Sequence, residues 1–311
     1  MRYIFSLRFF MPLRPTTIAI TKFKRASTSN AVFSIVIPTW NNLPYLKLCV
    51  ESIRKNSEFN HQIIVHLNEG IDGSLEWIKQ QTDIDYVHSE NNIGVCYALN
   101  GCRSLVETSY MLFLNDDMYV LPKWDKHLKD EIDHLNSPYF FLSSTAIEPV
   151  FSSNCAIQKD YGKTIETFRE AQLLSEFEDI PKKDWFGATW PPNVVHVDVW
   201  DMVGGYSTEF SPGLYSDPDF SMKLWKMGIR LFKGVTKSRV YHFGSKSVNR
   251  VSKNPGYYKF IGKWGMTSGT LSKHYLKRGE PFNGPLPEAQ RTISNHLKNI
   301  FKGLIAVFQR T

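Results

Sequence analysis

The sequence lacks several features that would assign it to well-known functional classes. No apolar run is long enough to cross a bilayer as a helix. There is no Cys/His spacing typical of a zinc site and no aromatic-basic RNA-binding signature, so the sequence predicts no nucleic-acid partner. No GxGxxG motif follows a predicted strand, which argues against a nicotinamide-dependent redox enzyme. We also find no internal repeat and no low-complexity tract.

Cysteine is scarce, with 4 residues in a chain of 311, and none of them forms a CxxC pair. The four are Cys49, Cys96, Cys102 and Cys155. Three of them fall on apolar faces of predicted helices, where a free thiol behaves as a small hydrophobe. The sequence therefore predicts free thiols in a reducing, cytoplasmic compartment, with the membrane surface as a further option, rather than a disulfide framework.

The composition is that of an ordinary globular protein, 42% hydrophobic and 22% charged, long enough for one large domain. Its formal net charge of +7 favours anionic partners such as nucleotide diphosphates, acidic glycans or lipid headgroups. Residues 1–31 hold six basic side chains and no acidic one. We expect this stretch to be a disordered basic tail; the alternative is an amphipathic arm that touches a membrane.

Strand-like and helix-like segments alternate through the first half of the chain. The predicted strands cover 33–38, 62–67, 84–88 and 110–114, and the predicted helices cover 46–56, 75–78, 94–106 and 122–135. Such an alternation, with right-handed crossovers, predicts a mostly parallel sheet flanked by helices. Further strands are expected at 139–143, 194–197, 229–232 and 239–241. Further helices are expected at 164–178, 217–228 and 293–308.

The stretch 110–118 (YMLFLNDDM) is the most informative for function. Five apolar residues suit a strand that is buried on both faces, and Asp116 and Asp117 follow where that strand should end. Ligands of open α/β sheets bind at the carboxyl ends of strands, and adjacent carboxylates repel each other unless a cation lies between them. Oxygen ligands of this kind suit Mg²⁺ or Mn²⁺ together with substrate phosphates. The alternative is a solvated turn in which an aspartate caps the next helix.

Several short motifs together resemble a family 2 glycosyltransferase of GT-A fold over about residues 33–245. In chain order they are 36–41 (VIPTWN), 91–94 (NNIG), 114–117 (LNDD), 204–206 (GGY), 216–220 (SDPDF) and 241–242 (YH). The resemblance implies an inverting transferase that uses a nucleotide-diphosphate sugar and a divalent cation, Mn²⁺ or Mg²⁺. It also implies three regions: the basic tail at 1–31, a GT-A domain at 32–245 and a basic helical extension at 246–311.

The resemblance assigns donor-binding roles by position. These fall to Pro38, Thr39, Asn68, Asn91, Gly94, Asn115 and Asp116. Asn68 stands where the family usually has an aspartate that reads the nucleobase, so the donor can be a UDP-, GDP- or dTDP-sugar. Asn115 replaces the usual first aspartate of the metal motif.

The same resemblance places the metal ligands and the catalytic base. It assigns Asp117 and His242 to the metal and Asp217 to the base, with Ser216 in place of the acid that often precedes the base. Asp217 is predicted at a helix start, where the helix dipole favours the ionised carboxylate. The alternative for Asp217 is a helix cap, and Asp219 is expected to be a cap or an acceptor contact.

The implied reaction moves a sugar to a hydroxyl on a glycan, a glycolipid or another acceptor, with peripheral membrane contact through the C-terminal helix as an option. Two alternatives remain from the residues. One is a catalytically inactive carbohydrate- or nucleotide-binding relative, which Asn68 and Asn115 allow. The other is a sugar-phosphate nucleotidyltransferase, although residues 39–42 (TWNN) stand where its Gly-rich phosphate loop should be. Trp185 and Trp190 suit either sugar stacking or core packing.

Overall fold

A computed structural model of the chain describes residues 18–25, 29–244, 256–289 and 293–308. Its strands are β1 (Thr21–Phe23), β2 (Ser34–Trp40), β3 (Gln62–Asn68), β4 (Ile84–Ser89), β5 (Tyr110–Phe113), β6 (Met118–Val120), β7 (Phe141–Glu148), β8 (Ile157–Gln158), β9 (Trp185–Phe186), β10 (Asn193–His196) and β11 (Phe232–His242). Its α-helices are α1 (Leu43–Asn56), α2 (Ser74–Lys79), α3 (Gly94–Cys102), α4 (Trp124–Leu135), α5 (Glu170–Glu176), α6 (Val197–Val203), α7 (Ser216–Lys226), α8 (Gly256–Trp264), α9 (Ser268–Thr270) and α10 (Ile293–Phe308).

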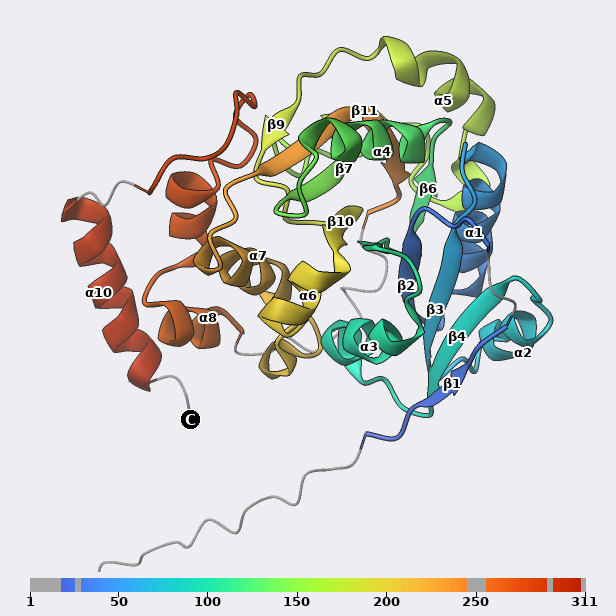
Figure 1. Ribbon diagram of the computed structural model, residues 1–311, viewed down its shortest axis with the longest axis horizontal. Helices are drawn as coiled ribbons and strands as arrows, with labels where there is room; N and C mark the ends of the chain where they lie inside the picture. Colours follow the sequence, from blue (N-terminus) through green and yellow to red (C-terminus); the bar gives the residue numbers. More distant parts are fainter. Residues whose placement is uncertain (1–17, 26–28, 245–255, 290–292, 309–311) are drawn as a thin grey trace, which may run out of the picture.

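All the strands belong to one mixed sheet, in the order β1-β4-β3-β2-β5-β10-β7-β11-β6, with β8 beside β7 and β9 beside β11 (Figure 1). β4, β3, β2 and β5 are parallel, as the alternating pattern predicts. β10 enters between β5 and β7 and runs antiparallel to both. The fold is therefore a mostly parallel sheet flanked by helices, and its mixed second half carries the later motifs.

The two faces of the sheet form separate apolar cores, because successive side chains of a strand point to opposite faces. Leu112 and Leu114 belong to the core beneath α1 and α4. Met111 and Phe113 belong to the core shared with α3, α6 and α7. The strand before the two carboxylates is thus buried on both faces, as its composition predicts.

Beyond β5 the structure has elements that were not predicted, among them β8, β9 and α6, and two further differences concern the strands that carry the later motifs. Met118–Val120 forms β6, a short strand that the turn residues around it conceal in the sequence. The separate strands expected at 229–232 and 239–241 are instead the single long strand β11, whose pairing with β7 shifts register between Val235 and Arg239. Polar residues at that shift interrupt the apolar pattern and make one strand look like two.

The prediction of a disordered tail is wrong for residues 18–25. Thr21–Phe23 pairs antiparallel with β4, and the ring of Phe23 stacks on Tyr86 at 4.4 Å. The backbone N–H of Arg25 donates to the Asp85 carboxylate at 2.6 Å. An edge strand of three residues is too short to register as a strand pattern. Residues 1–17 and 26–28 lie outside the described part of the chain.

The four cysteines are buried and free, as predicted. Trp185 is also a core residue, because its ring packs on the backbone of Gly234 and its indole N–H donates to Thr145 at 2.9 Å. Of the two explanations for this tryptophan, core packing is the one the structure supports.

The segment after residue 255 packs into the core of the sheet. Phe260, Leu271 and Leu286 belong to the same apolar cluster as α7, and residues 279–286 form backbone hydrogen bonds with residues 184–186 and 230. Residues 246–255 of the extension expected at 246–311 lie outside the described ranges.

A buried aspartate, Asp219, anchors α8: its carboxylate accepts hydrogen bonds from Ser207 at 2.6 Å and Trp264 at 2.8 Å, and Lys263 lies at 2.9 Å. Asp219 is thus neither a helix cap nor an exposed acceptor contact.

We expect Asp219→Ala to lower the free energy of unfolding by about 2–4 kcal/mol, since it leaves the partners of a buried carboxylate unsatisfied. Chemical denaturation measures this loss. Asp130→Ala is the matched control, because Asp130 forms only an exposed ion pair with Lys126, and its effect should stay below about 0.5 kcal/mol. Equal stability of the two variants would contradict the anchoring role.

Candidate active site

The loops that leave β2 and β3 are held together by side chains of the predicted nucleotide side. The hydroxyl of Thr39, next to Pro38 at the end of β2, donates to Asp116 at 2.6 Å. Asn68 is buried; its amide N–H₂ donates to the carbonyl of Thr39 at 3.2 Å, and its oxygen accepts from the N–H of Ile93 at 2.9 Å. Asn68 therefore joins three loops, and both ends of its amide have protein partners.

The next loop is locked to the segment that precedes α7. Gly94 has φ +77°, and a Cβ there would lie 2.4 Å from the Ser211 hydroxyl and 2.5 Å from Cα of Pro212. Only glycine fits this close approach without a shift. The N–H of Val95 donates to the carbonyl of Pro212 at 3.0 Å, while Asn91 stays exposed at the rim of the loop. The predicted nucleotide side and the predicted base are thus structurally connected.

Asp117 and His242 meet because β6 and β11 pair in antiparallel register. His242 is the partner of Met118, so it lies beside Asp117, and the His242 Nε2 to Asp117 Oδ1 distance is 3.4 Å. Asn115 lies two residues before Asp117, and its backbone carbonyl accepts a hydrogen bond from the Cys49 thiol at 3.6 Å. The far side of the imidazole contacts Glu148, with 2.6 Å between Nδ1 and Oε1.

The charges around His242 shift its pKa strongly. Burial lowers the pKa of the imidazole, but Asp117 and Glu148 more than offset this effect and raise it to about 10. In the metal-free chain His242 therefore holds an extra proton at neutral pH, and Nε2 can ligate a cation only when that proton is released, while Nδ1 stays bonded to Glu148.

The donor set fits an open Mg²⁺ or Mn²⁺ site rather than a closed cage. Within the described ranges, no group of three or more His, Cys, Asp or Glu side chains is arranged to hold a metal ion. Asp117 and His242 offer one carboxylate and one imidazole, which leaves positions for diphosphate oxygens and water. Substrate-linked Mg²⁺ and Mn²⁺ are held in this way, by one or two protein ligands.

Asp217 lies in the first turn of α7 but does not cap that helix, which has no side-chain cap hydrogen bond. Its carboxylate instead accepts a hydrogen bond from the hydroxyl of Tyr206 at 3.0 Å. Tyr206 is buried, stacks on Phe220 at 4.7 Å, and its backbone N–H donates to Asn100 at 2.9 Å. Asp217 is therefore held in place while its second oxygen remains for another partner.

The pKa of Asp217 is raised from 3.8 to about 7. Burial is the main cause, and the hydrogen bond from Tyr206 and the positive charge of Arg278 lower the pKa by less. Desolvation therefore outweighs the helix dipole, which was expected to favour the ionised carboxylate. A carboxylate with a pKa near 7 can accept a proton at neutral pH.

Both acidic centres lie around the end of β5. The ring of Phe113, the last residue of β5, meets Tyr206 edge-on at 6.2 Å, and Tyr206 holds Asp217. Asp117 is four residues further along the chain. The structure therefore places the metal motif and the α7 carboxylate at the same edge of the sheet.

Comparison with known proteins adds a family to this geometry. Residues 34–154 match the family described as glycosyl transferase family 2. The matched stretch runs from β2 to β7, so this part of the chain is similar to family 2 glycosyltransferases. No curated protein matches the chain significantly by sequence.

Solved structures resemble the fold over most of the length of the chain. S. aureus TarS 1-349 superimposes with a TM-score of 0.54 at 14% identity, covering 89% of this chain and 72% of that one. The same fragment in complex with UDP gives 0.54 at 15% identity, with the same coverages. Its complex with UDP-GlcNAc gives 0.51 at 15%, covering 89% and 73%. At such identity the likeness shows the fold alone.

Three site residues of the glycosyltransferase were missed from the sequence. Tyr206 orients Asp217, Glu148 contacts His242, and Arg278 lowers the pKa of Asp217. Glu148 and Arg278 lie outside the motifs and reach the site through the β7–β11 pairing and the packing of the C-terminal segment. Tyr206 belongs to the GGY motif, which could have indicated it.

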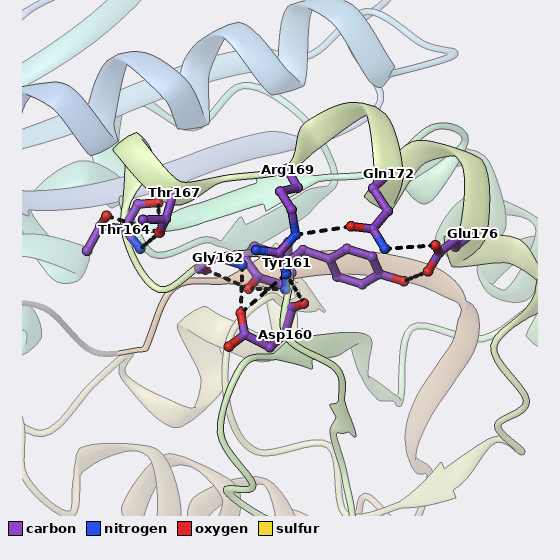
Figure 2. A network of polar contacts seen from close by, with 9 residues as sticks. Asp160, Tyr161, Gly162, Thr164, Thr167, Arg169, Gln172 and Glu176 are labelled. Atoms are coloured by element: carbon purple, nitrogen blue, oxygen red, sulfur yellow. Dashed lines mark hydrogen bonds and ion pairs between the residues drawn. The ribbon is translucent and has the colours of Figure 1, made fainter.

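A polar network supports the end of β11 beside His242. Figure 2 shows Arg169 donating to Gln172, and Gln172 and Tyr161 both bonded to Glu176. The hydroxyl of Tyr241 accepts from the N–H of Tyr161 at 3.1 Å and donates to the carbonyl of Gly162 at 2.7 Å. Residues 164–178, predicted as one polar helix, instead form a 3-10 turn at 165–167, the short helix α5 and a 3-10 turn at 177–179. The turn just before them, at Tyr161 and Gly162, fixes the position of β11.

Proposed function

We propose that the protein is a metal-dependent, inverting glycosyltransferase that moves a sugar from a nucleotide-diphosphate donor to an acceptor hydroxyl. The observation that carries the proposal is the carboxylate of Asp217, which does not cap its helix and has a pKa of about 7. It lies at the edge of the sheet where Asp117 and His242 meet. The TarS fragment in complex with UDP and with UDP-GlcNAc supports a UDP-sugar as the first donor to test.

In this proposal the donor lies along the loops that follow β2, β3 and β4. The nucleotide is bordered by Pro38, Thr39, Asn91 and Gly94. Asn68 holds the loops that carry these residues together. Asp117 and His242 would hold the cation, with Asn115 and Asp116 beside it, and the cation would stabilise negative charge on the leaving diphosphate as a Lewis acid. Asp116 stays fixed by the hydroxyl of Thr39.

Asp217 acts on the acceptor. An acceptor hydroxyl is a poor nucleophile, so it needs a base within hydrogen-bond reach as the new bond forms. Asp217 takes the hydroxyl proton while the oxygen attacks the anomeric carbon from the side opposite the leaving diphosphate. One direct displacement inverts the anomeric configuration, and no covalent sugar–enzyme intermediate is needed. Tyr206 keeps the carboxylate aimed at the acceptor side.

A nucleotide panel tests the donor half of the proposal. UDP, GDP and dTDP are each added with Mn²⁺, with Mg²⁺ or with a chelator, and the melting temperature is measured. Because a ligand that binds the folded state stabilises it by mass action, one nucleotide should raise the melting temperature by several degrees only when metal is present. Equal stabilisation in the chelator arm would contradict the metal site.

A nucleotidyltransferase would instead release pyrophosphate from a nucleoside triphosphate and a sugar phosphate.

The C-terminal helix supports a second proposal, contact with an anionic membrane surface. The exposed apolar residues of α10 form one stripe: Ile293, Leu297, Ile300, Phe301 and Leu304. The opposite face packs on the protein, where Asn299 accepts hydrogen bonds from Thr267 and Thr270. The 16-residue helix carries Lys298 and Lys302 and no acidic residue, which complements anionic headgroups.

Figure 1 shows α10 at the margin of the molecule. In the described residues no helix has the length and apolarity to cross a membrane.

We expect Leu297→Glu to weaken binding to phosphatidylserine-containing vesicles about tenfold or more, because it places a charge where a leucine would enter the interface. Co-sedimentation with vesicles measures the effect. Met202→Glu is the matched control, since Met202 is 59% exposed on α6. Self-association that Leu297→Glu abolishes, without vesicle binding, would instead assign the apolar stripe to a second copy of the chain.

A further inference from the structure

A cavity of about 260 Å³ lies against the C-terminal segment that packs on α7, and its lining is strongly basic. Lys273, Lys277 and Arg278 contribute three positive charges from the C-terminal segment. Cys155 lines the opposite wall, and Glu280 is the one acidic residue of the lining. The volume suits a phosphate-sized group together with a part of the molecule that carries it.

Lys273 is exposed and Lys277 and Arg278 are half-buried, and all three differ from the partly buried cations nearby. Lys233 lies at 2.7 Å from Glu131 and 3.0 Å from Asp184, and Lys263 is paired with Asp219. By contrast, no carboxylate among the described residues lies within ion-pair distance of Lys273, Lys277 or Arg278. A cluster of cations without anionic partners concentrates anions from solution.

Arg278 is held in place by its neighbours. Its guanidinium lies 3.7 Å from the centre of the Trp190 ring, and its Nη2 donates to the Cys155 sulfur at 3.7 Å. Its Nε–H is buried and has no hydrogen-bond partner. The same positive charge acts on Asp217 and lowers the pKa of that carboxyl. Arg278 therefore offers a preformed donor group in the wall of the cavity.

The turn that carries these side chains is fixed by its backbone. Lys277 has φ +47°, a left-handed conformation that is costly for a residue with a Cβ. The N–H of Arg278 donates to Ser272 at 2.9 Å, and the N–H of Gly279 donates to Phe186 at 3.0 Å. A Cβ at Gly187 would lie 2.3 Å from the Arg278 side chain. Such a turn presents its charges with little ordering cost on binding.

We propose that this cavity binds a phosphate group of the acceptor, so that the enzyme glycosylates a hydroxyl of a phosphate-bearing molecule. The inference rests on the proposed function, because it takes Asp217 as the acceptor-side base. Arg guanidinium and Lys ammonium groups are the side chains that recognise phosphate. The donor diphosphate is the other source of the same chemistry. We assign the cavity to the acceptor because the segment that lines it packs on α7, the helix of Asp217, where the ring of Tyr275 meets Trp225 at 5.3 Å. Asp117 and His242, by contrast, serve the diphosphate.

The test uses inorganic phosphate and glycerol phosphate as probes, titrated calorimetrically into the full chain without metal or nucleotide. We expect saturable binding that weakens at least about tenfold in Arg278→Gln and in Lys273→Gln. Lys129→Gln removes the same charge from the exposed face of α4, where Lys129 pairs with Asp133, and should leave the affinity unchanged. Arg278→Lys keeps the charge and should retain part of the affinity, even if Arg278→Gln folds poorly.

A second arm titrates the nucleoside diphosphate with Mg²⁺ and separates the two sources of phosphate. The affinity in Arg278→Gln should stay within about twofold of that of the unmodified chain, and glycerol phosphate should bind with the nucleotide already in place. Displacement of glycerol phosphate by the nucleotide, or a parallel loss of nucleotide affinity, would overturn the acceptor assignment, as would unchanged phosphate binding in Arg278→Gln. Failure of the proposed function is distinct, since it would abolish nucleotide binding and leave the phosphate arm intact.

Discussion

Replacing Asp217 by asparagine should abolish sugar transfer, with kcat lowered about 10³-fold or more, while the affinity for the nucleoside diphosphate stays within about twofold. The amide keeps the shape of the side chain and can still accept the hydrogen bond from Tyr206, but it cannot take a proton. Measuring kcat and nucleotide affinity on the same preparation separates loss of the base from loss of the donor site.

The same substitution should stabilise the protein in a pH-dependent way. The pKa of Asp217 is about 7 in the folded state and about 3.8 when unfolded, so the native chain loses stability as the pH rises between these values. Asparagine has no charge to bury, so the variant does not lose this stability as the pH rises. At pH 8 the variant should therefore be more stable by about 2–4 kcal/mol, and the difference should vanish near pH 4.

Asp219 provides the matched comparison, two residues along the same helix. Asp219→Asn retains the size of the side chain but removes a charge that Lys263 and Trp264 engage, so it should destabilise the protein at pH 8. An Asp217→Asn variant that turned over the true acceptor at the native rate, or that lost stability as Asp219→Asn does, would contradict the assignment of the base.

Replacing Asp117 by asparagine should remove metal-dependent nucleotide binding. It takes away one of the two protein ligands proposed for the cation, and the expected loss of affinity is about a hundredfold, to the level seen with a chelator. Calorimetry with UDP in the presence and absence of Mn²⁺ measures this loss.

The control for Asp117 is Asp130→Asn, which removes an equal charge from an exposed position on α4. This variant should bind the nucleotide as the unmodified chain does. Nucleotide binding by Asp117→Asn that still responds fully to Mn²⁺ would place the cation elsewhere. His242→Ala would then show whether the imidazole alone can hold the cation.

The parallel half of the sheet is predictable because its strands and helices are local and strongly patterned. β2, β3, β4 and β5 are buried strands between helices with clear apolar faces, and their order follows from the handedness of the crossovers. Asp117 could be placed at a strand end for the same reason. Its contact with His242 follows from the resemblance and not from local pattern, since the two residues are far apart in sequence.

The mixed half of the sheet is harder to predict because its pairing is not local. β6 is three residues long, and β10 inserts between two strands from another part of the chain. The pKa of Asp217 depends on burial by Tyr206 and α3, while the sequence showed only a helix start. Asn68 illustrates the same limit: its position is predictable, but its role in joining three loops depends on contacts with Thr39 and Ile93.

The most direct test is a crystal structure with the nucleotide-diphosphate sugar and Mn²⁺ bound. The account predicts that the diphosphate contacts the cation held by Asp117 and His242. It also predicts that the carboxylate of Asp217 lies on the opposite side of the anomeric carbon, within reach of an acceptor hydroxyl. A complex in which Asp217 opens into a different cleft, or lies on the same side of the sugar as the diphosphate, would contradict it.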